Sequence, residues 1–197
     1  LFEDSFKQHW ALPAMTNYEG RSYTFGEMAE AIDEWHLFFA SQGLQHGDKV
    51  ALMGKDTAEW AIFFLAVITY GAVIVPVLQD FPPADAMQII DHSESKILGI
   101  NPSLWEGMNV AGILDFQEGH ILHASAGTAE VEAQLQQAKA DHRTRFPQGM
   151  RPEDVSYYQT PNEDLMVLNY TSGTTGFSKG VMLSGNNFAG NLTFCME

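Results

Sequence analysis

The chain has 197 residues, of which 45% are hydrophobic, so a packed core is expected rather than a disordered segment. Ten Lys and Arg residues stand against 25 Asp and Glu residues, and the net charge of −15 argues against non-specific binding of nucleic acid or of an anionic membrane surface. The single cysteine, Cys195, excludes an intrachain disulfide framework and suits a cytoplasmic protein.

The first predicted helix follows Thr24. The stretch T-F-G-E places a hydroxyl at the N-cap and Glu27 three residues later, which is the pattern of a capping box. Gly43 is suited to end the helix. Between them, apolar residues recur at helical spacing: Phe25, Met28, Ile32, Trp35 and Phe39.

A strand, a helix and a second strand are predicted next. Residues 49–53 (KVALM) form a short apolar run. Asp56 suits the start of a helix that Gly71 ends. The β-branched residues of 73–77 then predict a buried strand.

The stretch 60–79 contains no charge and reaches the length of a membrane-spanning helix. Gly71 and Pro76 interrupt it, and 73–75 is a β-branched run. We therefore favour a buried helix followed by a buried strand and expect no transmembrane segment.

Alternating strands and helices continue toward the middle of the chain. This alternation predicts an α/β fold with a mostly parallel sheet flanked by helices. The predicted elements are a helix from Pro82 and Pro83 to about His92, a strand at 96–100, a short helix near Leu104, strands at 113–116 and 119–125, a helix at 128–140 and a connecting loop at 141–164.

His120 and His123 form an H-x-x-H pattern in the predicted strand 119–125. Side chains three residues apart on a strand point to opposite faces of the sheet. We therefore do not expect the two imidazoles to share a metal ion.

The most informative stretch is Y-T-S-G-T-T-G-F-S-K-G-V, residues 170–181, between the predicted strand 165–170 and a strand that begins at Val181. Glycines let backbone N–H groups converge on an anion, hydroxyls add donors, and a lysine adds positive charge. We favour phosphate binding over a merely flexible loop. The candidate phosphate-binding residues are Thr171, Ser172, Gly173, Thr174, Thr175, Gly176 and Lys179.

The spacing differs from the Walker pattern G-x-x-x-x-G-K-S/T. Gly176 precedes Lys179 by three residues, and an apolar strand rather than a helix follows. The strand–loop–helix of the Walker nucleotide-binding proteins is therefore the wrong template.

Residues 170–181 resemble the phosphate loop of the adenylate-forming (AMP-binding) superfamily, with Ser178 where proline is usual. Residues 24–28, 47–51 and 71–77 are also similar to motifs of that superfamily. The resemblance covers about residues 20–197 and is strongest to long-chain fatty-acid–CoA ligases. It implies that residues 1–197 are an incomplete N-terminal large domain that ends in the phosphate-loop hairpin. The rest of the large domain and a C-terminal lid domain would lie elsewhere in a longer protein.

The resemblance implies ATP-dependent activation of a fatty acid to an acyl-adenylate, with release of pyrophosphate, followed by transfer to coenzyme A. Thr171 to Gly176 would enclose the β- and γ-phosphates, Lys179 would stabilise the leaving pyrophosphate, and Thr171 would bind Mg²⁺. The residues that bind adenine and ribose, and the catalytic lysine, would lie outside this chain. We assign no catalytic residue within it.

Three alternatives stay open. The parent protein could activate an amino acid or another carboxylate, the chain could be a stand-alone phosphate-binding module, or the loop could serve only as a hairpin in an interaction protein. The sequence does not determine the acyl-chain length, the acceptor thiol or the oligomeric state. We expect a cytoplasmic location and leave a peripheral membrane association open.

Overall fold

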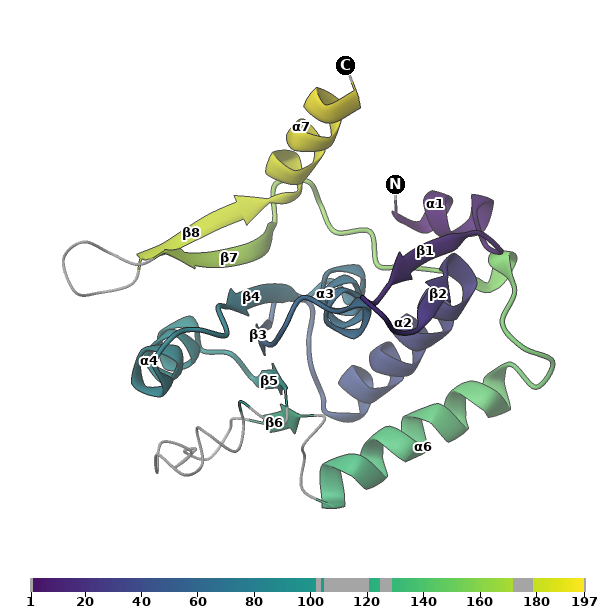
Figure 1. Cartoon of the computed structure of the whole chain (residues 1–197), viewed down its shortest axis with the longest axis horizontal. Helices are drawn as coiled ribbons and strands as arrows, with labels where there is room; N and C mark the ends of the chain where they lie inside the picture. Colours follow the sequence, from purple (N-terminus) through teal and green to yellow (C-terminus); the bar gives the residue numbers. More distant parts are fainter. Residues whose placement is uncertain (1, 102–103, 105–120, 125–128, 172–178, 197) are drawn as a thin grey trace.

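A computed structural model describes residues 2–101, 104, 121–124, 129–171 and 179–196 of the chain (Figure 1). The helices are α1 (Phe2–Gln8), α2 (Phe25–Ser41), α3 (Ala58–Tyr70), α4 (Pro83–Ser93), α6 (Ala129–Arg145) and α7 (Gly185–Met196), with a 3-10 helix at Pro152–Asp154. The strands are β1 (Pro13–Thr16), β2 (Ser22–Thr24), β3 (Lys49–Met53), β4 (Val73–Val77), β5 (Ile97–Ile100), β6 (Ile121–Ala124), β7 (Leu165–Thr171) and β8 (Lys179–Ser184).

Six strands form the central sheet in the order β6-β5-β3-β4-β7-β8, and β1 pairs with β2 in a separate antiparallel ribbon. All neighbours in the central sheet are parallel except β7 and β8. Every residue of β5 and four of the five in β3 and in β4 are buried, as expected for parallel strands covered on both faces. The predicted fold class is confirmed.

Helices cover the two faces of the sheet through two separate hydrophobic clusters. One cluster joins α2 and α3 to the sheet through residues such as Phe38, Phe63 and Ile74. The other joins α4 to the opposite face through Ile89, Ile90 and neighbouring residues. Figure 1 shows α4 on the other side of the strands from α2 and α6.

The helix boundaries largely follow the predicted signals. The Thr24 hydroxyl accepts a hydrogen bond from the Glu27 amide at 3.1 Å, and the Glu27 carboxylate accepts one from the Thr24 amide at 2.8 Å, so the capping box of α2 is confirmed. The start of α3 differs, because Thr57 rather than Asp56 is the N-cap and accepts from the Trp60 amide. Gly71 ends α3 with a φ of +88°, which favours glycine.

The charge-free stretch 60–79 lies in α3 and β4, as predicted. Within the described part of the chain, no helix has both the length and the apolar character that crossing a membrane requires.

The predicted loop at 141–164 is more ordered than expected. α6 continues past the predicted end at residue 140 to Arg145, because no glycine or proline occurs between residue 140 and Pro147. The connection that follows buries Met150, Val155 and Tyr157 against the helices of the α2–α3 cluster. This segment therefore completes the core instead of only linking two elements.

The other predictions for the middle of the chain have mixed outcomes. The strand at 119–125 is confirmed as β6, and the helix at 128–140 as the first part of α6. The predicted strand at 113–116 lies outside the described residues, as does His120. The hairpin at the end of the predicted fold is present, and α7 follows it. The elements α1, β1, β2 and α7 were not predicted.

Candidate functional site

The candidate phosphate loop connects the two strands of the β7–β8 hairpin. Thr171 ends β7, Lys179 begins β8, and the two residues are cross-strand partners. Because β7 runs parallel to β3, β4 and β5, the loop leaves the sheet at the carboxyl ends of these strands. Ligands of open α/β sheets bind at this edge.

Of the seven predicted phosphate-binding residues, the structure describes Thr171 and Lys179, and both are exposed. Ser172, Gly173, Thr174, Thr175 and Gly176 lie outside the described residues. β8 begins at Lys179 rather than at the predicted Val181. The lysine is therefore part of the regular hairpin stem, level with Thr171.

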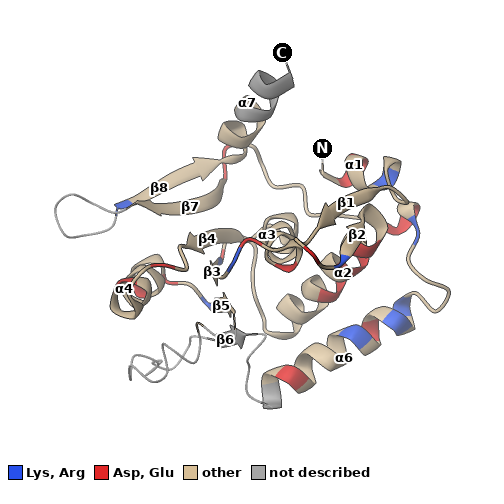
Figure 2. Ribbon diagram, viewed as in Figure 1, with Lys and Arg blue, Asp and Glu red and all other residues tan. Residues whose placement is uncertain are grey.

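The charge of Lys179 is available to a ligand. Among the described residues, Lys179 forms no ion pair, whereas Lys49 and Lys96 each contact a carboxylate. Figure 2 shows a basic residue at the start of β8, well separated from the acidic residues of α2. A cation in this position can receive an anion despite the net charge of −15.

A tyrosine next to the loop attaches the hairpin stem to α4. Tyr170 is 4% exposed, and its hydroxyl lies 2.7 Å from Nδ1 of His92. The two rings meet edge to face, with centroids 5.8 Å apart. Burial raises the pKa of the Tyr170 phenol, so the hydroxyl stays protonated at neutral pH. Sequence reasoning missed His92, because 78 residues separate it from Tyr170.

Thr171 is the candidate ligand for Mg²⁺ at the loop. Within the described ranges, no group of three or more His, Cys, Asp or Glu side chains could hold a metal ion. One hydroxyl fits a magnesium ion only where phosphate oxygens and water supply the other ligands, which is the usual arrangement for Mg²⁺ at nucleotides.

A separate hollow of about 1030 Å³ lies at the carboxyl ends of β3 and β5, between α2, α3 and α6. Burial raises the pKa of Glu34, which lines it. A hollow with this surplus of carboxyl groups disfavours a polyphosphate. Its acidic residues are Glu27, Glu30, Glu34, Glu59 and Glu132, against the basic residues Arg21, Lys55 and Lys139.

The sequence model of a family described as "AMP-binding enzyme" matches residues 2–197. The chain is similar to a 4-coumarate–CoA ligase-like protein of Oryza sativa subsp. japonica, with 31% identity over 90% of this chain and 30% of that protein. It is 28% identical to surfactin synthase subunit 1 of Bacillus subtilis (strain 168), over 93% of this chain and 4% of that protein. It is 24% identical to the medium-chain fatty-acid–CoA ligase of Escherichia coli (strain K12), over 92% of this chain and 32% of that protein.

Solved structures share the fold. The anthranilate–CoA ligase AuaEII in complex with anthranoyl-AMP matches 98% of this chain and 35% of its own, with a TM-score of 0.76 and 19% identity. ATP-bound MatB from Rhodopseudomonas palustris matches 96% of this chain and 36% of its own, with a TM-score of 0.69 and 24% identity. The chain thus spans about a third or less of the length of these relatives.

Proposed function

The chain belongs to the AMP-binding enzyme family, and from this premise we propose that it supplies the phosphate-binding part of an enzyme that activates a carboxylate with ATP. The observation that carries the proposal is the position of Thr171 and Lys179. They are cross-strand partners at the end of the β7–β8 hairpin, on the side of the sheet where the parallel strands have their carboxyl ends. The loop between them has the composition of a phosphate nest.

The proposed reaction has two steps. A carboxylate oxygen attacks the α-phosphorus of ATP, the bond from this phosphorus to the bridging oxygen breaks, and pyrophosphate leaves with the bonding electrons. The thiolate of coenzyme A then attacks the acyl carbon, and AMP leaves. The first step needs no general base, because a carboxylic acid is already ionised at pH 7.

The chain contributes electrostatic stabilisation of the leaving group. Lys179 places a positive charge at the loop, where negative charge develops on pyrophosphate. The N–H groups and hydroxyls of residues 172–176 would bind the β- and γ-phosphates. Mg²⁺, when bound beside Thr171, neutralises part of the phosphate charge.

We propose a fatty acid as the carboxylate and coenzyme A as the acceptor. The medium-chain fatty-acid–CoA ligase among the relatives and the apolar run V-M-L after Gly180 favour this choice. Amino-acid activation is the alternative, since a surfactin synthase subunit is also similar. Pyrophosphate release by the full-length protein separates the two: release with fatty acids but not with amino acids is expected, and the reverse would select the alternative.

The substitution Lys179→Ala in the full-length protein tests the role of the loop. We expect the loss of about 2–4 kcal/mol of transition-state stabilisation, which lowers kcat/KM for ATP roughly 30- to 1000-fold. Lys179→Arg keeps the charge and should retain part of the activity.

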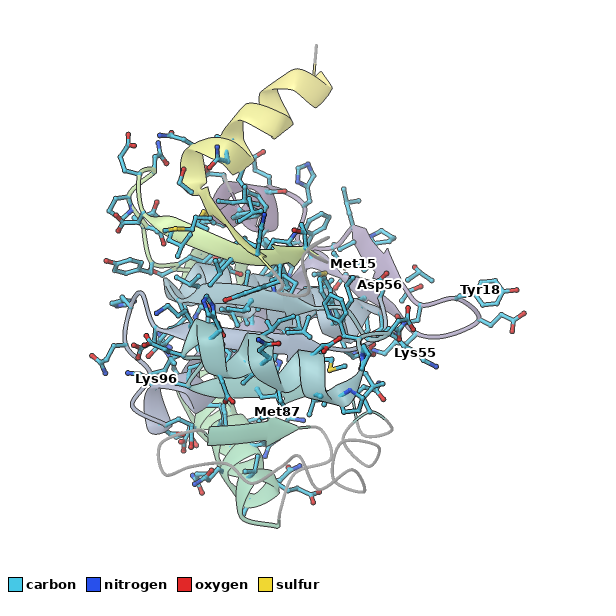
Figure 3. All side chains as sticks on the ribbon, turned by 90° about the vertical axis from the view of Figure 1, so that its left-hand side faces the viewer. Met15, Tyr18, Lys55, Asp56, Met87 and Lys96 are labelled. Atoms are coloured by element: carbon cyan, nitrogen blue, oxygen red, sulfur yellow. The ribbon has the colours of Figure 1, made fainter. Side chains whose placement is uncertain are left out.

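Lys96→Ala is the matched control. Lys96 precedes β5 at the amino ends of the parallel strands (Figure 3), and among the described residues its ion-pair partner is Asp48. Its removal should leave activity unchanged. Unchanged activity in Lys179→Ala would instead favour the hairpin as a structural feature. ATP binding without carboxylate-dependent pyrophosphate release would favour a phosphate-binding module.

A further inference from the structure

We propose that His92 is a positioning residue for Lys179 at the end of the hairpin stem and acts through its hydrogen bond to Tyr170. The inference rests on the proposed function of the loop. It assigns a role to α4, an element that carries none of the predicted site residues.

Tyr170 connects the loop directly to the core. It immediately precedes Thr171, and its side chain packs in the cluster that joins α4 to the sheet, together with Val77 and Ile90. Its hydroxyl extends to Nδ1 of His92, near the carboxyl end of α4. In Figure 1, α4 lies below the loop end of the hairpin.

The neighbouring strand gives the loop no support beyond this point. β7 pairs with β4 at Val167 and Ile74, and counting along both strands brings Tyr170 level with Val77, where β4 ends. Thr171 therefore extends past the end of β4, with β8 as its strand neighbour. The contact between Tyr170 and His92 therefore joins the hairpin to the core at the level where β4 ends.

The position opposite Tyr170 is fitted to this arrangement. Gly180 pairs with Tyr170, and a Cβ atom there would lie 3.4 Å from the tyrosine Cζ and 3.0 Å from Cδ1 of Leu168. Glycine leaves room for the ring to reach His92. Lys179, which precedes Gly180, is therefore attached to a stem that the Tyr170 ring and its hydrogen bond to His92 help to fix.

Small displacements of this stem matter, because catalysis by a preorganised charge depends on its position, and a shift of about 1 Å can cost two orders of magnitude in rate. Loss of the hydrogen bond should displace the stem by less than this distance, so a smaller loss of rate is expected. We expect His92→Phe, which keeps an aromatic ring and loses the bond, to lower kcat/KM for ATP about tenfold. The KM for the carboxylate should not change.

The experiment uses the full-length protein and two single variants, His92→Phe and Tyr170→Phe, with the double variant. Both single variants should show the same loss, and the double variant should be no worse than either, because each removes the same bond. His92→Gln offers an amide in place of the imidazole and should recover part of the activity. Gln88→Ala, one helical turn earlier on the same face of α4 and exposed like His92, is the control and should be unchanged.

A merely structural role predicts a different pattern. It would lower the melting temperature and would impair kcat/KM for ATP and for the carboxylate alike. His92→Gln would then show no recovery. That pattern, additive losses in the double variant, or full activity in His92→Phe would overturn the proposal. If Lys179→Ala is inactive while His92→Phe is fully active, only the positioning role fails. If Lys179→Ala is also fully active, the proposed function fails.

Discussion

The imidazole of His36 on α2 has a strongly lowered pKa. Its Nε2 lies 3.0 Å from the carbonyl oxygen of Ala66 and 3.1 Å from the Thr69 hydroxyl. Burial lowers its pKa to about 4, against 6.5 for an unperturbed histidine. Between these values the unfolded chain binds the proton and the folded chain does not. Stability is therefore lost as the pH falls from 6.5 to 4, by about 2 kcal/mol at pH 5.

The substitution His36→Gln checks this pH dependence. Urea unfolding at pH 7 and at pH 5 should show a smaller loss of unfolding free energy in the variant than in the unchanged protein. His9→Gln is the control, because His9 is exposed and its replacement should preserve the slope. Equal slopes in the His36 variant and the unchanged protein would contradict the assignment.

Gly71 combines a backbone constraint with a close approach. Its φ is +88°, and a Cβ atom there would lie 2.4 Å from Cδ1 of Tyr158 and 2.7 Å from Nδ1 of His46. We expect Gly71→Ala to lower the free energy of unfolding by roughly 2–4 kcal/mol. Gly43→Ala is a matched control, since Gly43 has a φ of +70° with no atom within 4 Å of the added Cβ. It should lose only about 1 kcal/mol in the same denaturant titration.

Residue-level prediction succeeds where the partners are close in sequence. Thr24 and Glu27 are three residues apart, and their capping box was predictable. The N-terminus of α3 depends in part on a contact that is distant in sequence. The side chain of Asn17 accepts a hydrogen bond from the Ala58 amide at 2.7 Å, across 41 residues. The contact between His92 and Tyr170 likewise depends on the sheet order, which no local pattern specifies.

At the scale of elements, α6 packs on the α2–α3 cluster through apolar residues such as Leu135 and Ala138, and polar contacts to α2 join it at its carboxyl end. Asp33 of α2 lies 2.8 Å from Nδ1 of His142 and 3.2 Å from Nη1 of Arg145. The side chain of His142 is 8% exposed. Removing the shared carboxylate leaves a buried polar ring without this partner, so Asp33→Ala should cost about 2 kcal/mol of stability.

Amide hydrogen exchange locates this effect. In Asp33→Ala the amides of α6 should exchange faster, while those of β3 and β4 keep most of their protection. Asp141→Ala is the control, because Asp141 is exposed and accepts a hydrogen bond from Gln137 of its own helix. Unchanged exchange in α6 would mean that its apolar contacts with α2 suffice to hold it.

Elements with strong apolar patterns were predictable, and short polar ones were not. The strands at 49–53 and 73–77 have the predicted boundaries, because each is an apolar run between turn signals. β2 has only three residues and depends on pairing with β1, so its sequence carries little periodicity. α7 had a usable signal: Ser184 precedes it, and its amide donates to the side chain of Asn187, as in a capping box.

At the scale of the whole molecule, the order of the sheet brings the candidate site together. The alternation of elements predicted a parallel sheet, and the loop composition predicted a phosphate site between two strands. The antiparallel pairing of β8 with β7 follows from the expected hairpin, whereas the position of β7 beside β4 required the structure. The motif resemblance therefore pointed to a phosphate site, whereas the contact between His92 of α4 and Tyr170 of β7 came from the tertiary structure alone.

The net charge of −15 also acts on the whole fold. Self-repulsion among carboxylates weakens the compact state, and salt screens it, with a Debye length of about 10 Å at 0.1 M ionic strength. The cross-element ion pairs, such as Lys96–Asp48 and Arg21–Glu27, lie at the surface and contribute little. Screening should therefore remove more repulsion than attraction.

We expect added sodium chloride to stabilise the protein. Between low salt and roughly 0.1 M, the free energy of unfolding should rise by about 1 kcal/mol, which moves the melting temperature by about 2–4 °C. Glu132→Lys, at an exposed position of α6, reduces the net negative charge by two and should reduce this salt dependence. A lower melting temperature in salt would show instead that the surface ion pairs outweigh the repulsion, since screening weakens both.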